Sequence, residues 1–473
     1  MWLGVDIGTS AVKLSLIDET LAEVAGASAP LTLQTPHPYW SEQEPEAWWA
    51  ALIAAMADLA TRADLRAVRA IGLSGQMHGA VLLDQADQVI RPAILWNDGR
   101  CFDEAEALAA QPWIGQLAGA PPLTGFTAPK LMWVKRHEPD AYARIAHILL
   151  PKDYVGLRLH GRHVTDKSDA AGTLWLDQAR REWSDALCEA SSVDPAWLPD
   201  CIEGVEVAGH LTGGAAAALG LRAGLPVVAG GGDAATGAVS VGATALGRAF
   251  ISLGTSGQLF IATDAYQPNP DQVVHSYAHA VPGMWFQMAA MLNGARPLSW
   301  FAAIADAPIA ALLAEAAEVE GEAPLFLPYL TGERTPHGDP HLRGAFLGLA
   351  DGMGRAHLAR AVVEGIAFTF ADAADGLRAA GADLKEVSAI GGGAQSDLLL
   401  QTIANVAGFR ITRTRQAQTG AAYGAALLAQ GEGRGGVAAA PIIADRSFEP
   451  VRENGLADRL ARFRAAYPAI RAI

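Results

Sequence analysis

The chain has few cysteines and few basic residues for its length. Its 473 residues include 3 cysteines, and 50 acidic residues outnumber 35 lysines and arginines, giving a formal net charge of −15. Three scattered thiols argue against a disulfide framework or a paired-cysteine metal site, and favour a reducing compartment. The acidic balance argues against a general nucleic-acid binder, which needs a basic surface. We therefore expect no nucleic-acid partner.

Export and membrane signals are also missing. Asp6 interrupts the N-terminal segment before any apolar stretch develops. The longest weakly charged stretch, residues 223–247, is mostly Gly, Ala and Val, whereas a spanning helix needs about 20 strongly apolar residues. No GxxxxGK[ST] loop occurs, and no dinucleotide fingerprint follows the first strand. These absences predict a cytoplasmic protein with no membrane partner and no NAD chemistry.

The pattern of apolar residues predicts an α/β protein. Apolar residues make up 51 % of the chain, which excludes disorder, and the length suits two to three domains. Alternation over residues 3–7 and 12–17 predicts a strand hairpin, with a third strand over 21–27. Residues 45–59 read as a helix and residues 68–73 as a strand. Strands and helices alternate from there on, which favours the α/β class.

Two segments of the first half recur in the second half. Residues 5–18 resemble residues 251–264, and residues 70–76 resemble residues 389–395, in the same order. Such an echo predicts two related domains that face one another. The boundary falls in a stretch of small residues, 237–248. The predicted domains are residues 1–242 and 243–473.

Each copy of the hairpin contains a Gly-Thr-Ser turn. These turns are Gly8-Thr9-Ser10 and Gly254-Thr255-Ser256. Small residues let backbone N–H groups approach an anion, and the hydroxyls add further donors. Either turn alone is more typical of an ordinary hairpin. Because there are two, on opposing domains, we expect a clamp for a polyphosphate.

Two carboxylates stand beside such turns. Asp6 precedes the first turn, where a carboxylate could hold Mg²⁺, often through water, or could cap the turn. The second copy has Ser252 at the corresponding place. Asp233 follows an apolar strand that ends in three glycines, so a substrate could approach it closely. Spacing alone leaves two roles open for Asp233, catalysis and helix capping.

Three further segments carry polar groups near predicted strand ends. Gln76 and His78 lie among glycines at the place where α/β domains bind ligands, although a lone histidine is more often structural. Trp96 and Asn97 form an aromatic and polar cluster that suits a sugar, or a turn. Bare backbone over residues 390–396 could receive a base and ribose. Residues 420–428 predict a helix of small residues that packs close to its neighbours.

At this point the chain resembles the FGGY carbohydrate kinases, within the sugar kinase/Hsp70/actin superfamily. The resemblance rests on residues 125–137 and on residues 344–349 with 357–364, and it runs from residue 1 to about residue 430. It implies two related ribonuclease H-like (actin-like ATPase) domains around a central cleft, with ATP and Mg²⁺ as ligands. Segments 74–80 and 91–100 are most similar to family members that phosphorylate D-xylulose.

The resemblance also implies a role for each matched residue. Asp233 matches the catalytic base, Asp6 the acidic residue that supports Mg²⁺, and Met77 and His78 the pair that contacts the sugar. Gln76 and Asn97 are placed with that pair. The expected ATP-binding residues are Gly8, Thr9, Ser10, Gly254, Thr255, Ser256, Gly392, Gly393 and Ser396. Tyr423 departs from many relatives, and a homodimer is the family expectation.

The expected reaction is the ATP-dependent phosphorylation of D-xylulose to D-xylulose 5-phosphate. One alternative is another FGGY kinase, acting on ribulose, gluconate or glycerol. A second is an actin- or Hsp70-like ATP switch that binds protein. The short segment after residue 430 leaves little room for a peptide-binding domain, which weighs against it. A third is a binding module with an inactive site, which the presence of both Asp6 and Asp233 disfavours.

Overall fold

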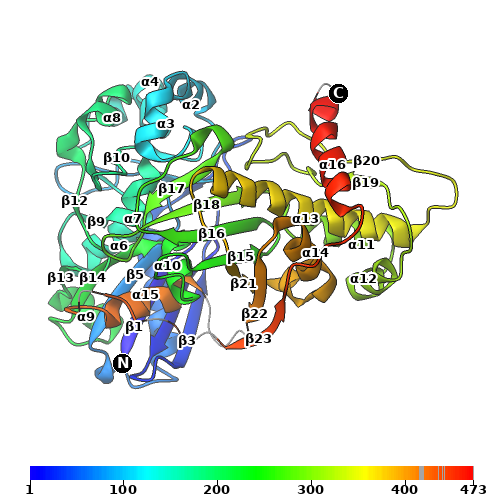
Figure 1. Cartoon of the computed structure of the whole chain (residues 1–473). Coiled ribbons are helices and arrows are strands. Elements are labelled where there is room, and N and C mark those ends of the chain that lie inside the picture. Colours follow the sequence, from blue (N-terminus) through cyan, green and yellow to red (C-terminus); the bar gives the residue numbers. More distant parts are fainter. Residues whose placement is uncertain (415–419, 435, 439, 441–442, 472–473) are drawn as a thin grey trace.

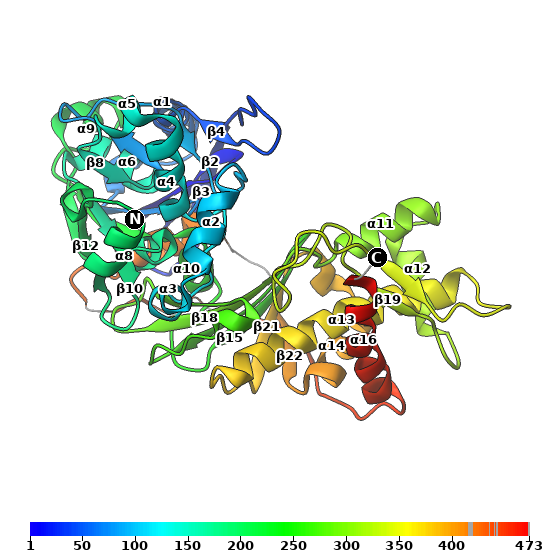
Figure 2. The ribbon, with the colours of Figure 1, turned by 90° about the horizontal axis from the view of Figure 1, so that it is seen from above.

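The computed structural model of the chain describes residues 1–414, 420–434, 436–438, 440 and 443–471. Two mixed β-sheets with helices against them form the two halves of the molecule (Figure 1). Seen from above, the lobe that carries the N-terminus is separate from the lobe that carries α11 to α14 and α16 (Figure 2). The α/β class expected from the sequence is confirmed.

The first sheet has six strands in the order β13-β14-β5-β1-β2-β3. β1 and β2 form the predicted antiparallel hairpin, and β3 adds the third strand. β1 also pairs in parallel with β5, which in turn pairs in parallel with β14. The strand bounds are β1 Trp2–Ile7, β2 Ala11–Ile17, β3 Glu23–Pro30, β5 Ala70–Gly75, β13 Val207–His210 and β14 Pro226–Gly232.

The second sheet repeats this pairing. β15 and β16 form a hairpin, β15 pairs in parallel with β21, and β21 pairs in parallel with β22. An antiparallel strand ends each series, β13 in the first sheet and β23 in the second. The echo in the sequence therefore corresponds to a repeated fold. The bounds are β15 Ala249–Leu253, β16 Gly257–Thr263, β17 Val274–Ala278, β18 Trp285–Met291, β21 Glu386–Ile390, β22 Arg410–Thr414 and β23 Ala444–Phe448.

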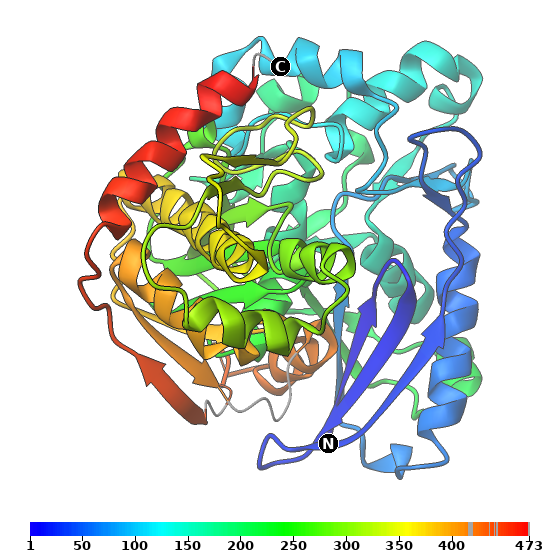
Figure 3. The same cartoon turned by 90° about the vertical axis from the view of Figure 1, so that its right-hand side faces the viewer.

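Helices bury the apolar faces of the sheets. The predicted helix over 45–59 is α1, which packs on the first sheet. Figure 3 shows the first hairpin and the C-terminal helix on opposite sides of the molecule. The main helices are α1 Pro45–Leu59, α2 Phe102–Ala109, α3 Pro112–Ala118, α4 Thr127–His137, α6 Pro151–His160, α9 Gly213–Leu219, α11 Arg296–Ile304, α12 Ile309–Ala317, α13 Arg355–Ala379, α14 Asp397–Ala407 and α16 Leu456–Arg471.

Two helices cross where the halves meet. α10 (Asp233–Ser240) leaves the first sheet, and α15 (Ala421–Gln430) returns from the second half to pack on strands of the first. A Cβ on Gly72 would lie 1.9 Å from the Ala425 carbonyl oxygen, and one on Gly424 would lie 1.9 Å from the Thr236 carbonyl oxygen. The close packing predicted for the small-residue helix is thus present. The division at residue 242 stays a prediction.

A second contact joins the halves. The Ser276 N–H in β17 donates to the Gly119 carbonyl at 2.7 Å, and Trp285 Nε1 in β18 donates to the Gln178 carbonyl at 2.6 Å. Figure 2 shows β18 running beneath α3 and β10 (Leu176–Asp177). The first half is therefore held to the edge of the second sheet as well as at the crossing of the two helices.

In the described part of the chain, no single helix is long and apolar enough to cross a membrane. Only α11 and α12 reach that length and composition, as a pair bent by 96°.

Candidate active site

Asp6 lies in β1, one residue before the end of the strand. Asp233 is the first residue of α10 and directly follows β14 of the same sheet. Asp6 is buried, its Oδ1 atom has no hydrogen-bond partner, and burial raises its pKa. Asp233 is exposed to solvent at the start of α10. Desolvation by the surrounding protein, followed by the negative charge of Asp6, raises the pKa of Asp233 to about 7. The two carboxylates thus interact.

Side chains from three segments fix the first Gly-Thr-Ser turn. Thr9 Oγ1 donates to Gln76 Oε1 at 2.8 Å and accepts from Trp96 Nε1 at 2.9 Å. Gln43 Nε2 donates to the Thr9 carbonyl at 2.7 Å, and its Oε1 accepts from Gln76 Nε2 at 3.0 Å. Gln76 is 1 % exposed, and both ends of its amide are bonded within the protein. It therefore positions the turn, and its contact with a sugar stays a prediction.

The second Gly-Thr-Ser turn is held through its backbone. The Gly254 carbonyl accepts from the Ala295 N–H at 2.7 Å, and the Thr255 carbonyl accepts from the Gly294 N–H at 3.1 Å. A Cβ on Gly294 would lie 2.3 Å from the Ser256 carbonyl oxygen, so only glycine fits there. Thr255 and Ser256 themselves are exposed. The geometry leaves their hydroxyls available to a ligand.

The glycines predicted to receive adenosine lie beside this second turn. Gly391 has a φ of +93°, and a Cβ on Gly393 would lie 3.0 Å from Leu253 Cβ, one residue before the turn. Gly392 is exposed. Ser396 caps α14, because its Oγ accepts from the Leu399 N–H at 3.2 Å. The structure brings Gly391 and Gly393 beside the second Gly-Thr-Ser turn, and the contact of the expected residues with ATP stays a prediction.

The backbone carbonyl and the ring Nδ1 of His78 are both hydrogen-bonded within the protein. His78 has a φ of +68°, and its carbonyl accepts from Lys130 Nζ at 2.7 Å and from Thr127 Oγ1 at 3.1 Å. Its Nδ1 lies 2.6 Å from the Gly172 carbonyl, which can only accept, so Nδ1 carries the proton. Nε2 is then left as an acceptor. Burial lowers the pKa of His78 to about 3, which keeps the ring neutral.

The expected sugar-contacting pair, Met77 and His78, packs closely against two glycines. A Cβ on Gly232 would lie 2.8 Å from Met77 Cγ, and a Cβ on Gly172 would lie 2.5 Å from His78 Nδ1. Gly232 directly precedes Asp233 in the chain. Met77 therefore packs on the turn that carries the candidate base, and the sharing of one site by these residues stays a prediction.

A cavity of about 600 Å³ opens between the two halves beside His78. Asn97 lines it, as do aromatic side chains of the first half. The second half contributes polar groups that the sequence did not single out. No residue of either Gly-Thr-Ser turn is among the described residues that line it. The residues that line the cavity include His78, Trp96, Asn97, Phe126, His275, Glu333 and Arg334.

Comparison with protein families decides what this site belongs to. Residues 1–240 match the N-terminal domain of the FGGY family of carbohydrate kinases, and residues 249–430 match its C-terminal domain. Together the two matches span most of the chain. The chain belongs to the FGGY family of carbohydrate kinases. An ATP switch without kinase activity and an inactive binding module are therefore set aside.

The relatives of this FGGY kinase include xylulose kinases. That of Escherichia coli (strain K12) is 45 % identical over 434 residues, covering 91 % of this chain and 90 % of the relative. That of Bacillus subtilis (strain 168) is 37 % identical over 437 residues, covering 90 % of this chain and 87 % of the relative. The resemblance expected from the motifs is thus confirmed over nearly the whole length.

Solved structures show the same fold. A xylulose kinase from Brucella ovis has a TM-score of 0.94 at 42 % identity, covering 100 % of this chain and 99 % of that one. The xylulose kinase from Rhodospirillum rubrum has a TM-score of 0.91 at 30 % identity, with coverage of 100 % and 99 %. The expected fold, two related domains of the actin-like ATPase type, is confirmed.

Sequence reasoning missed several residues that shape the site of this FGGY kinase. Lys130 is buried, and its Nζ bridges the carbonyls of His78 and Gly125, each at 2.7 Å. Lys130 lies within segment 125–137, on which the family resemblance rests. The sequence therefore marked the segment but did not show which groups Lys130 binds. Glu333 is also buried, and burial raises its pKa to about 7. Nothing in its local sequence indicates that it faces the cavity.

A buried ionic cluster supports the turn before Asp233. Lys152 Nζ lies 2.5 Å from Asp153, 2.9 Å from Asp166 and 3.5 Å from Asp169. Asp166 accepts from Ser168 Oγ, which in turn accepts from the Gly232 N–H at 3.1 Å. This chain of bonds connects the cluster to the residue that precedes the candidate base. Its role is to position that turn.

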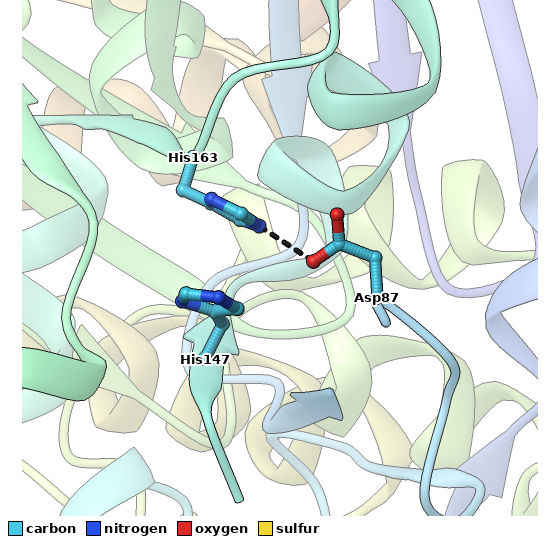
Figure 4. Close-up of side chains that lie close together, drawn as sticks. All are labelled: Asp87, His147 and His163. Carbon is cyan, nitrogen blue, oxygen red and sulfur yellow. Dashed lines mark hydrogen bonds and ion pairs between the residues drawn. The ribbon is translucent and has the colours of Figure 1, made fainter. Parts of the chain in front are cut away.

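Outside the cavity, the described residues contain one group of three potential metal ligands. Asp87, His147 and His163 have ligand atoms within 4.8 Å of one another (Figure 4). His163 Nε2 lies 2.7 Å from Asp87 Oδ1, and the two imidazole rings stack at 3.9 Å with 18° between their planes. An imidazole lone pair lies in the plane of its ring, so stacked rings do not both aim at one ion. The arrangement fits an Asp–His hydrogen bond instead.

Proposed function

We propose that this FGGY kinase transfers the γ-phosphoryl group of ATP to the terminal hydroxyl of D-xylulose, giving D-xylulose 5-phosphate and ADP. The observation that carries the proposal is the setting of Asp233. Its carboxyl, with a pKa raised to about 7, adjoins Asp6 and the turn on which Met77 packs. The sugar is inferred from the relatives, which are named xylulose kinases.

Asp233 acts as the general base in this proposal. Its carboxylate accepts a hydrogen bond from the sugar hydroxyl and takes the proton as the new P–O bond forms. A carboxyl group with an ordinary pKa near 4 is a weak base at neutral pH, whereas a pKa near the working pH suits proton transfer. Burial and the neighbouring charge of Asp6 supply that shift. The chemistry therefore explains why the two carboxylates lie close together.

The residues present fit a divalent cation at Asp6. Asp6 Oδ1 is buried without a hydrogen-bond partner, and Asp233 brings a second negative charge nearby. Hard cations prefer carboxylate and water oxygens, so Asp6 would hold Mg²⁺ directly or through water. When bound, Mg²⁺ neutralises charge on the phosphate oxygens of ATP. The negative charge of Asp6 also contributes, after burial, to the raised pKa of Asp233.

The phosphates are assigned to the two Gly-Thr-Ser turns, which lie on different sheets. In the first turn the Thr9 hydroxyl and the Gly8 N–H are already bonded within the protein, so the donors assigned to the phosphates are the Thr9 and Ser10 N–H groups and the exposed Ser10 hydroxyl. In the second turn the exposed hydroxyls of Thr255 and Ser256 add to the backbone. Adenosine is assigned to Gly392, Gly393 and Ser396. With the domains divided at residue 242, closure would bring sugar and nucleotide together and exclude water.

The substrate assignment is tested by a panel of sugars in a coupled assay of ADP release. We expect D-xylulose to give the highest kcat/KM, ahead of ribulose, gluconate and glycerol. A structural neighbour at 25 % identity is a gluconate kinase, so gluconate is the most informative competitor in the panel. A higher kcat/KM for any other sugar would reassign the substrate within the family.

The rate should depend on pH through Asp233. Its pKa is raised, so the protonated, inactive form dominates below pH 7, and kcat/KM should fall about tenfold for each pH unit below that value. His78 does not contribute, because its pKa of about 3 keeps it neutral. Lys130, with a pKa lowered to about 7, loses charge with rising pH and has the opposite sign. A flat profile from pH 5.5 to 8 would contradict this assignment.

Glu333 provides the control for that profile. Its pKa is also about 7, and it lines the cavity, so it titrates over the same range. Glu333→Gln removes this titration without altering Asp233. If the acidic limb persists in Glu333→Gln, the limb belongs to Asp233. If it disappears, the base assignment loses its pH evidence.

His78→Ala should weaken sugar binding selectively. The substitution removes the Nε2 acceptor at the cavity, so the KM for the sugar should rise about tenfold, the value of one buried hydrogen bond. The KM for ATP should change by less than about twofold, because the nucleotide turns are elsewhere. Steady-state kinetics with each substrate varied in turn measures both. An equal rise in the two KM values would remove His78 from the sugar site.

A further inference from the structure

Arg334 lies in a loop of the second half whose neighbouring residues are firmly anchored. On one side, Glu333 Oε1 accepts from the backbone N–H groups of Leu292 at 2.6 Å and of Arg334 at 2.8 Å. On the other side, Thr335 Oγ1 donates to the Val273 carbonyl at 2.8 Å and accepts from the Ala290 N–H at 3.1 Å. Both anchors are buried. The backbone that carries Arg334 is therefore fixed against β17 and β18.

The guanidinium of Arg334, by contrast, has no bonding partner in the described part of the chain. Within the described residues it makes no hydrogen bond and no ion pair, although desolvation already lowers its pKa. Other arginines with little exposed side chain are paired: Arg100 with Asp98, and Arg459 with Glu364. A partly desolvated guanidinium without acceptors is costly. Its five donors suit a ligand rich in oxygen acceptors.

The cavity that Arg334 lines indicates which ligand this is. Arg334 belongs to the wall opposite His78 and Asn97, and its charge is near enough to lower the pKa of His78. Aromatic side chains such as Trp96 and Phe126 complete the wall, as is suitable for the apolar face of a sugar. No residue of the phosphate turns is among the lining residues described. His78 and Asn97, the expected sugar contacts, line the same cavity, so we infer that the oxygen-rich ligand is the sugar.

We propose that Arg334 is a sugar-binding residue contributed by the second domain. Its guanidinium donates hydrogen bonds to hydroxyl or carbonyl oxygens of the open-chain sugar, on the side opposite His78. The bound sugar then connects the two halves and favours the closed arrangement in which transfer occurs. This inference rests on the proposed function, because it assumes that the cavity holds the phosphoryl acceptor.

The test compares Arg334→Gln and Arg334→Lys with the wild-type enzyme. Arg334→Gln should raise the KM for the sugar roughly 10- to 100-fold, the loss expected for hydrogen bonds from a charged donor. Arg334→Lys keeps the charge but not the fork of donors, so its KM should lie between the two. Calorimetric titration with the sugar alone, without ATP, should show the same order of affinities. The KM for ATP should change by less than about twofold.

Arg343→Gln is the matched control. Arg343 is in the same loop and exposed, its Nη1 donates to the Pro340 and Leu342 carbonyls, and it does not line the cavity. It should leave both KM values unchanged. A melting temperature for each variant separates loss of binding from loss of folding, and Arg334→Lys keeps the test valid if Arg334→Gln does not fold.

The outcomes separate this proposal from the proposed function. All measurements use the sugar that the wild-type enzyme phosphorylates fastest, so a sugar other than D-xylulose would change the substrate and leave the test of Arg334 intact. An unchanged sugar KM and sugar affinity in folded Arg334→Gln would overturn the proposal. So would a rise confined to the KM for ATP, since the guanidinium would then face the nucleotide.

Discussion

Asp233→Asn is expected to lower kcat by about 10³-fold or more. The substitution keeps the shape of the side chain and removes the base, and general-base catalysis accounts for about 10²- to 10⁴-fold in rate. Loss of the base cannot be compensated by a neighbour, because Asp6 is buried and is assigned to the cation. Asp233→Ala should be equally inactive. Initial rates of ADP release at saturating sugar and ATP measure the loss.

Folding and nucleotide binding serve as controls for this variant. Asp233→Asn removes one of two interacting negative charges, so its melting temperature should not fall below that of the wild-type enzyme. ATP should still bind measurably by calorimetry, since the phosphate turns are unchanged. Asp264→Asn, at an exposed position of the second hairpin, should keep full activity. Retention of more than a few per cent of wild-type turnover by Asp233→Asn would show that another group accepts the proton.

The hairpins and the repeat of the fold could be predicted from the sequence, because they depend on patterns within short segments. Alternation around a Gly-Thr-Ser turn located the first hairpin, because period-two alternation and turn residues act within a few positions. Recurrence of the hairpin predicted the repeat, and the sheets show equivalent pairing of β1 with β5 and of β15 with β21. Bare glycines before Asp233 indicated an approachable carboxylate. The raised pKa of Asp233 depends first on desolvation in the folded protein and then on the charge of Asp6, which is distant in sequence.

Contacts between distant segments account for what the sequence did not reveal. Gln76 has the chemistry of a sugar ligand, but Gln43 and Thr9 occupy its amide, and only the folded chain brings the three together. Arg334 and Glu333 come from the second half and line a cavity whose other wall includes His78. A single sequence gives no signal that two such walls meet. The sequence does not distinguish a side chain that is bonded within the protein from one that is available to a ligand.

Gly424→Ala is expected to destabilise the enzyme strongly and to impair catalysis. A Cβ at this position would lie 1.9 Å from the Thr236 carbonyl oxygen and 2.7 Å from its carbon, whereas carbon and oxygen normally approach to about 3.3–3.6 Å. α15 and α10 would have to separate by more than about 1 Å. We expect a loss of about 3 kcal/mol or more in unfolding free energy, measured as a melting temperature lower by several degrees.

The same displacement should reduce kcat, because α10 begins at Asp233 and carries the base with it. Gly237→Ala is the matched control, since Gly237 lies in the same helix as Thr236 and a Cβ there would meet nothing within 4 Å. Alanine is favoured over glycine in a helix by about 1 kcal/mol, so this control should keep or raise the melting temperature. Both variants make one chemical change, Gly to Ala. If Gly424→Ala and Gly237→Ala have the same melting temperature, the contact between α10 and α15 tolerates separation and does not fix the position of Asp233.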